Sequence, residues 1–217
     1  MRVFIGFDKR QPLAYTVARS SVERHAKGRV LVEPLRLDWL PITRRGLTDF
    51  TFSRYLVPWL CDYQGVAVFL DADTIVRADI RELEDLIGEF DAVAVVQGEL
   101  RFEWPSVMVF RCDNYRCRML TPAHVNDEQT KPHTLDWAGD RVGALPLEWN
   151  HIVPYMPRRS DPKLVHYTAG IPCWPETRKS EHAELWLEEY RHAVGTCSWE
   201  QLMGQSVHRQ ALKLING

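Results

Sequence analysis

The sequence predicts an α/β fold: one domain of 217 residues built around a mixed, mostly parallel central sheet. Short apolar, β-branched runs alternate with segments of helical periodicity, which is the pattern of βα units. Hydrophobic residues make up 45% and charged residues 26%, as in ordinary globular proteins. No repeat, low-complexity tract or linker divides the chain, and its length suits a single α/β domain.

Each element follows from local patterning. The expected elements, in chain order, are a strand at 3–6, a helix at 12–24, a strand at 30–37, a short helix at 52–61, a strand at 66–70, a helix at 79–90, strands at 92–96, 107–110, 144–149 and 164–167, and helices at 180–193 and 198–214. Pro12 suits a first helical turn. Residues 66–70 are apolar throughout and stop at acidic residues. Ile80, Leu83 and Ile87 share one helical face.

The remaining segments carry less regular signals. Residues 121–137 are polar and contain two prolines, which predicts a long loop, and long loops are often functional. Ser198 and Gln201 form a capping box for the last helix. In parallel sheets ligands bind beyond the carboxyl ends of strands, so the chemistry is expected there.

Composition excludes several function classes. The net charge of −2 leaves no large basic excess for sequence-blind nucleic-acid binding, although a local basic groove stays open. Five scattered cysteines indicate reduced thiols. No run approaches the roughly 18 apolar residues of a membrane span, and no signal peptide is visible. A cytoplasmic protein without an integral membrane segment is expected.

The sharpest local signal is a D-x-D motif at the end of the apolar strand 66–70. Asp71 and Asp73 lie two residues apart on extended chain, so their carboxylates project to the same side. Paired carboxylates repel unless a cation is bound, and hard oxygen ligands suit Mg²⁺ or Mn²⁺. The alternative is a surface loop with two solvated acids.

Two enzyme classes place D-x-D after an apolar strand. Haloacid-dehalogenase-like phosphatases use D-x-D-x-T, with the first Asp as nucleophile, which here would be Asp71. In this chain Ile75 occupies the fifth position, where the phosphatase motif has Thr. The phosphatase motif also normally follows the first strand, whereas about 65 residues precede the motif here. Nucleotide-sugar glycosyltransferases of the A-type fold place the motif after a first half of about this length.

The wider pattern resembles the second class. FSRYLVP at 52–58, VFLDADTIV at 68–76 and DIREL at 79–83 are similar to consecutive motifs of glycosyltransferase family eight, the glycogenin-like and bacterial galactosyltransferase-like enzymes. IGFD through AY, within 5–15, resembles that family's opening strand, and HYTAGIPCW at 166–174 resembles its H-[FY]-x-G-x-x-K-P-W string. The resemblance covers most of residues 1–175.

The resemblance implies a GT-A fold and a retaining, metal-dependent transfer from a UDP-sugar. Asp71, Asp73 and His166 would hold Mn²⁺ or Mg²⁺. Arg54 and Asp136 would be the catalytic residues. Arg54 would reach the donor sugar and an acidic residue, and Asp136 would contact the donor sugar. Asp140 is the competing candidate for the role of Asp136. No protein nucleophile is assigned, because the departing phosphate oxygen can serve as the base.

The resemblance also implies a donor-binding set. Its members are Asp8, Tyr15, Asp71, Ser106, Gly170 and Trp174. Asp8 would accept from the uracil N–H, and Tyr15 would stack on the base or pack as a helix core residue. The family's diphosphate-binding Lys is absent, since Pro172 and Cys173 occupy that part of the string.

The division expected within the single domain has three parts: a nucleotide-binding half at about 1–75, a donor-sugar and acceptor half at about 76–175, and C-terminal helices at about 176–217. The acceptor is left open among saccharide, lipid-linked sugar, protein and nucleic acid. A non-catalytic nucleotide- or carbohydrate-binding module is the main alternative function. Eight Trp residues are present. Trp104, Trp137, Trp149 and Trp174 are expected to line a sugar cleft, and Trp39, Trp59, Trp186 and Trp199 to pack.

Overall fold

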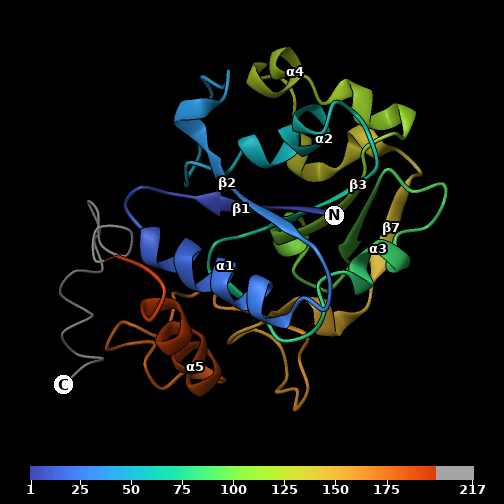
Figure 1. Cartoon of the computed structure of the whole chain (residues 1–217). Coiled ribbons are helices and arrows are strands. Elements are labelled where there is room, and N and C mark those ends of the chain that lie inside the picture. Colours follow the sequence, from blue (N-terminus) through green and yellow to red (C-terminus); the bar gives the residue numbers. More distant parts are fainter. Residues whose placement is uncertain (199–217) are drawn as a thin grey trace. The chain divides into compact units, whose positions relative to one another are not determined.

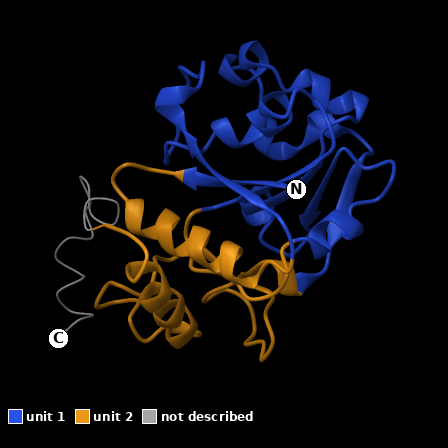
Figure 2. Cartoon of the chain, viewed as in Figure 1, with its two compact units in different colours: residues 1–6, 28–71, 81–147 blue, residues 7–27, 72–80, 148–217 orange. Residues whose placement is uncertain are grey.

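The computed structural model describes residues 1–198, which form two compact units (Figure 2). Unit 1 comprises residues 1–6, 28–71 and 81–147, and the described part of unit 2 comprises residues 7–27, 72–80 and 148–198. The predicted last helix, with Trp199, lies outside the described residues. The division at about 75 and 175 expected from the sequence stays a prediction.

Unit 1 is built on a six-stranded sheet with the order β2-β1-β3-β6-β5-β7 (Figure 1). Its strands are β1 (Arg2–Phe7), β2 (Leu31–Arg36), β3 (Val66–Leu70), β5 (Val93–Val96), β6 (Val107–Arg111) and β7 (Val142–Leu145). Parallel pairing joins β1 to β3 and β5 to β7, and antiparallel pairing joins β6 to both β3 and β5. The predicted α/β class with a mixed sheet is confirmed.

The core of unit 1 lies in the middle strands. Every residue of β5 is buried, as are four of the five in β3, because these strands are apolar on both faces. Short helices surround the sheet. They are α2 (Val57–Leu60), α3 (Glu82–Leu86), α4 (Pro122–Asn126), and the 3₁₀ helices η1 (Leu37–Trp39), η2 (Ser53–Leu56), η3 (Arg101–Ser106), η4 (Tyr115–Met119), η5 (Pro132–Thr134) and η6 (Asp136–Ala138).

Unit 2 combines two longer helices with a small sheet of order β4-β9-β8. Its elements are α1 (Pro12–His25), β4 (Thr74–Val76), β8 (His151–Ile152), β9 (Leu164–His166) and α5 (Ala183–Val194), with η7 (Leu147–Trp149) leading into it. Helices α1 and α5 pack on each other, and α1 also packs on β4. Buried Ser21 on α1 accepts a hydrogen bond from the Val76 N–H at 3.0 Å, which fixes that helix against the strand.

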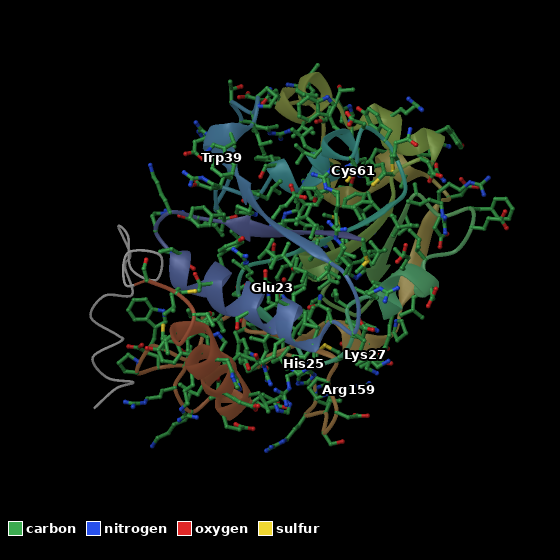
Figure 3. The ribbon with its side chains drawn as sticks, in the orientation of Figure 1. Glu23, His25, Lys27, Trp39, Cys61 and Arg159 are labelled. Carbon is green, nitrogen blue, oxygen red and sulfur yellow. The ribbon has the colours of Figure 1, made fainter. Side chains whose placement is uncertain are left out.

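A buried ion cluster joins the elements of unit 2. Glu189 on α5 has no exposed surface, and its carboxylate accepts from Arg24 at 3.0 Å and lies 3.0 Å from His25 Nε2. Arg77 lies 3.1 Å from the same carboxylate. His25 is at the C-terminal end of α1, close to Glu23 and Lys27 (Figure 3). A buried carboxylate of this kind needs such partners, because an unpaired buried charge is very costly.

Several elements differ from the predicted ones. The amphipathic segment 79–90 is helical only over α3, although Ile80, Leu83 and Ile87 are buried as expected. The predicted helix at 52–61 is split into η2 and α2. The segment expected to be a loop at 121–137 contains α4, η5 and η6. Strands β4 and β8 were not predicted, since three and two residues carry no readable period.

The tryptophans divide differently from the prediction. Trp137 and Trp149 are buried, Trp137 stacking on Phe110, so neither ring presents an open face to a sugar. Trp39, expected to pack, is 65% exposed and lies beneath the Arg36 guanidinium. Trp186 is buried against Tyr190 as expected. The cysteines of the described residues are free thiols, and within residues 1–198 no helix is long and apolar enough to cross a membrane.

Candidate functional site

In unit 2, the second Asp of the D-x-D motif lies beside His166. The antiparallel pairing of β4 with β9 sets Thr74 opposite His166, which brings the preceding Asp73 to the end of β9. Asp73 Oδ1 is 3.3 Å from His166 Nε2. The His166 side chain is buried, whereas the Asp73 side chain is 30% exposed. The pair therefore has one buried member and one that solvent or a ligand can reach.

Asn150 fixes the orientation of the His166 ring. Its side-chain oxygen lies 3.1 Å from His166 Nδ1, and Asn150 is buried just before β8. Parallel pairing of β8 with β9 sets Ile152 opposite His166, so the backbone brings the amide to the ring. Because the amide oxygen only accepts, Nδ1–H is the donor, and a neutral imidazole would carry its lone pair on Nε2.

This arrangement suits a cation. In that neutral form, the Nε2 lone pair and the Asp73 carboxylate are both acceptors, and they face each other at 3.3 Å. Two acceptors this close need a proton or a metal ion between them. A buried His whose second nitrogen donates to a fixed oxygen is the usual arrangement of a metal-binding His. The donor set of carboxylate oxygen and imidazole nitrogen therefore fits a divalent metal ion.

The residues after His166 are held closely to this pair. The Tyr167 N–H donates to the Asp73 carbonyl at 2.9 Å, and its hydroxyl donates to the His182 carbonyl at 2.8 Å. Gly170 has a φ of 116°, a conformation that L-residues with side chains rarely adopt. Trp174 is half-buried in the turn that follows. Two predicted donor-binding residues thus lie on the segment directly after His166.

In unit 1, the first Asp of the motif is paired with Arg54. Arg54 Nη2 lies 2.9 Å from Asp71 Oδ1, and both side chains are nearly buried. The guanidinium also donates to the Pro105 carbonyl at 2.8 Å and stacks over the Phe69 ring at 4.8 Å. The sequence predicted both residues as site residues, and the structure brings them together.

Ser106 is adjacent to Asp71 through the sheet register. Leu70 pairs with Val107, so the Asp71 N–H reaches the Ser106 carbonyl at 2.9 Å. The Ser106 hydroxyl donates to Glu103 at 2.8 Å, and both side chains are buried. Glu103, which the sequence analysis missed, is therefore the residue that orients Ser106. Its position three residues earlier in a short 3₁₀ helix was the available signal.

The predicted uridine contacts, Asp8 and Tyr15, both lie near the start of α1 in unit 2. Asp8 is buried and pairs with Arg10, whose backbone N–H also donates to Asp8 Oδ1 at 2.8 Å. Tyr15 is 8% exposed, and its ring meets Phe7 edge-on at a centroid distance of 5.4 Å. The structure gives these residues internal partners, and their nucleotide roles remain predictions.

Asp136 lies on the rim of a cavity in unit 1. The cavity has a volume of about 370 Å³, and its lining includes Gln97, Arg101 and Trp104. The Asp136 side chain is exposed and accepts from the Thr134 hydroxyl at 2.7 Å. Its competitor Asp140 is 74% exposed and pairs with the neighbouring Arg141. Of the two, Asp136 faces a space that can admit a ligand.

Asn150 was not among the predicted site residues. It ends the string LPLEWN at 145–150. Its contact with His166 depends on the β8–β9 pairing, and β8 is only two residues long. The recurring string was the only sequence signal for it.

Comparison with known proteins identifies the family. No family model matches the chain. Protein CDI of Arabidopsis thaliana is 34% identical over 220 aligned residues, which cover 87% of this chain and 85% of that protein. This chain belongs to the family of Protein CDI. The match extends over most of both chains.

Solved glycosyltransferases share the fold. The bifunctional glycosyltransferase WbbM superposes with a TM-score of 0.70 at 17% identity, over 95% of this chain and 51% of WbbM, so the chain spans about half of that protein. The galactosyltransferase LgtC, solved with donor and acceptor sugar analogues, gives a TM-score of 0.62 at 14% identity. The match covers 94% of this chain and 100% of LgtC. GlyE of Streptococcus pneumoniae gives a TM-score of 0.63 at 15% identity. The match covers 99% of this chain and 64% of GlyE. This chain thus has the GT-A fold that the sequence predicted.

Proposed function

We propose that this member of the Protein CDI family is a metal-dependent glycosyltransferase, which moves a sugar from a UDP-sugar to an acceptor hydroxyl with retention of configuration. The observation that carries the proposal is the trio of Asp73, His166 and Asn150. The amide orients the imidazole so that Nε2 faces the carboxylate at 3.3 Å. The motif order along the chain, which resembles glycosyltransferase family eight, and the shared GT-A fold support it.

Asp71, Asp73 and His166 would hold the ion. Asp71 is separated from Asp73 by Ala72 alone, so the covalent chain limits the distance between their backbones to about 7 Å. Two carboxylates and one neutral imidazole suit Mn²⁺ or Mg²⁺, which keep further positions for phosphate oxygens. When bound, such an ion neutralises charge that develops on the leaving diphosphate.

The remaining roles belong to residues of the chain itself. Arg54 would orient Asp71 and present N–H donors to the donor sugar, because its guanidinium is already held by Pro105 and Phe69. Asp136 would accept from sugar hydroxyls at its cavity. Asp8 and Tyr15 would contact the uracil, and the segment containing Gly170 and Trp174 would cover the donor. These assignments follow the resemblance, residue by residue.

The stereochemical course follows from where the acceptor would sit. No residue is assigned as a nucleophile, and the acceptor hydroxyl would attack from the face that the diphosphate leaves. The departing phosphate oxygen would then take the hydroxyl proton, as a base already positioned beside the reacting carbon. Acceptor classes remain open, and small basic spots such as Arg44-Arg45 and Arg158-Arg159 are the candidates for holding a phosphorylated one.

The test is a screen of nucleotide sugars with Mn²⁺, read by UDP release and thermal shift. We expect release from one UDP-sugar that chelation abolishes. Asp73→Asn and His166→Gln should lower release at least about 100-fold, since each removes a ligand. Asp161→Asn is the matched control, because that carboxylate is 84% exposed.

Three outcomes would contradict the proposal. Full release by both site variants would exclude the metal-dependent mechanism, and phosphate release from simple esters without a nucleotide would favour the phosphatase. Donor binding without turnover at any metal concentration would support the non-catalytic binding module. The absent family Lys favours that module, because Cys173 at that part of the string is buried and uncharged.

A further inference from the structure

A second cluster of metal-binding side chains lies elsewhere in unit 2. His151 is on β8, whereas Glu181 and His182 directly precede α5. His151 Nε2 lies 3.1 Å from Glu181 Oε1, and His182 Nε2 lies 3.0 Å from the same oxygen. One ligand atom from each of the three residues falls within 4.8 Å of the others. Three residues from two separate segments thus converge on one point.

Both imidazoles are buried, and their hydrogen bonding is incomplete. His151 has no exposed surface and His182 is 5% exposed. His182 Nε2 has no hydrogen-bond partner among the described residues, although Glu181 Oε1 lies 3.0 Å away. Buried polar atoms normally find a partner, so this nitrogen calls for one.

The surroundings of His151 disfavour the charged form of its imidazole. Burial lowers the pKa of His151, and the neighbouring His182 lowers it further, against the opposing effect of Glu181. The two rings meet edge-on at a centroid distance of 5.4 Å.

The spacing matches a tetrahedral ion. Ligand atoms about 2.0–2.1 Å from a tetrahedral centre lie about 3.3 Å from one another. The two measured separations to Glu181 Oε1, 3.0 and 3.1 Å, are close to that value. Two His and one Glu form a known ligand set of Zn²⁺, whose fourth position is taken by water. Glu181 is 17% exposed, so solvent can reach the centre.

We propose that His151, Glu181 and His182 form a Zn²⁺ site, with water as the fourth ligand. The ion would tie the start of α5 to β8, two segments 30 residues apart in the chain. His182 is already held in place for this, since its carbonyl accepts from Tyr167 and its backbone has a φ of 58°. Glu184, 3.9 Å from His182 Nδ1, is the adjacent carboxylate that would orient that ring.

The test uses the full chain carrying Asp73→Asn, which removes a ligand from the proposed donor site and so separates the two sites. The metal-free protein is dialysed against Zn²⁺ alone and its zinc content is measured by mass spectrometry. We expect one equivalent of zinc and a rise in melting temperature. His182→Gln and Glu181→Gln should each weaken zinc binding by about 10–100-fold or more. His192→Gln, an exposed His on α5, is the matched control.

A second measurement tests the proposal without the site variants, in case one of them fails to fold. Co²⁺ alone is added to the metal-free Asp73→Asn protein, and a visible absorption spectrum of tetrahedral Co²⁺ with nitrogen and oxygen ligands is expected. Absence of that spectrum together with zinc below one equivalent would overturn the proposal. Zinc retention by His182→Gln equal to that of His192→Gln would overturn it as well. In either case the trio is a hydrogen-bonded cluster without metal.

Discussion

The side-chain oxygen of Asn150 lies 3.1 Å from His166 Nδ1, and this contact determines which ring nitrogen of the imidazole is available to a ligand. A ring held at Nδ1 offers Nε2 in one direction, toward Asp73. The proposed donor-site ion therefore depends on a buried amide that does not contact it. Partners of this kind typically matter nearly as much as the ligands.

Replacing Asn150 by Leu should weaken Mn²⁺ binding by about 10–100-fold, because the buried His166 Nδ1–H loses its acceptor. Titration of the free protein with Mn²⁺, followed by the electron paramagnetic resonance signal of free Mn²⁺, measures the affinity. Asn150→Asp keeps an acceptor and should bind at least as well as the parent protein. Equal affinity in Asn150→Leu and the parent would show that the amide does not orient the ligand.

Replacing Glu189 by Gln should lower the free energy of unfolding by about 3 kcal/mol, because the change removes the buried partner of Arg24 and Arg77. Urea denaturation measures the loss. Glu188→Gln is the matched control, since Glu188 contacts the same two Arg residues but is 45% exposed. That change should cost less than about 1 kcal/mol, and similar losses in both variants would contradict a special role for the buried carboxylate.

Stability should fall in acid partly through the same carboxylate. Burial alone would raise the pKa of Glu189, but the hydrogen bonds from Arg24 and His25 outweigh it, so its pKa lies below the usual range. A carboxyl with a depressed pKa in the folded state contributes stability above its unfolded value, about 4.3, and loses it as pH falls through the folded value. Urea midpoints from pH 6 down to pH 3 should drop less steeply in Glu189→Gln. Parallel curves would refute this.

Replacing Gly170 by Ala should destabilise the protein by about 1–3 kcal/mol, because its φ of 116° strains any residue with a Cβ. Gly195→Ala provides the contrast. Gly195 has a φ of −70°, and a Cβ there meets neighbouring atoms no closer than 3.5 Å. That change should stabilise by about 0.4–1 kcal/mol. Thermal and urea unfolding of the pair should therefore shift in opposite directions, and a common direction would count against the strain.

Some of the fold could be predicted because single residue types determine it locally. The β3 strand matches its predicted bounds, 66–70, since a continuous apolar run meets Asp71. The helix predicted at 79–90 ends at Leu86, and the hydrophobic periodicity of the sequence does not indicate why. The Asp91 carboxylate accepts from the Gly88 N–H at 3.0 Å and forms a turn there, which competes with helix. Turn chemistry thus overrode an amphipathic pattern.

Contacts within the candidate site could be predicted where the residues are neighbours in sequence or belong to a known motif. Asp73 and His166 belong to recognisable strings, and the β4–β9 pairing brings them together. Contacts such as Asn150 to His166 or Ser106 to Glu103 depend on strands and turns too short to predict. The burial of Trp137 and Trp149 depends likewise on tertiary packing, which overrides the preference of Trp for sugar surfaces.

Tyr167 connects the two proposed metal sites. Its backbone N–H is bonded to Asp73, and its hydroxyl is bonded to His182. The side chain is buried, and only two torsions connect those ends, so one residue physically links the two clusters. If an ion at one cluster favours the conformation that the other cluster binds, then each ion strengthens the other by the same factor. Zinc would in that case be an allosteric activator of donor binding, and Tyr167→Phe would uncouple the two.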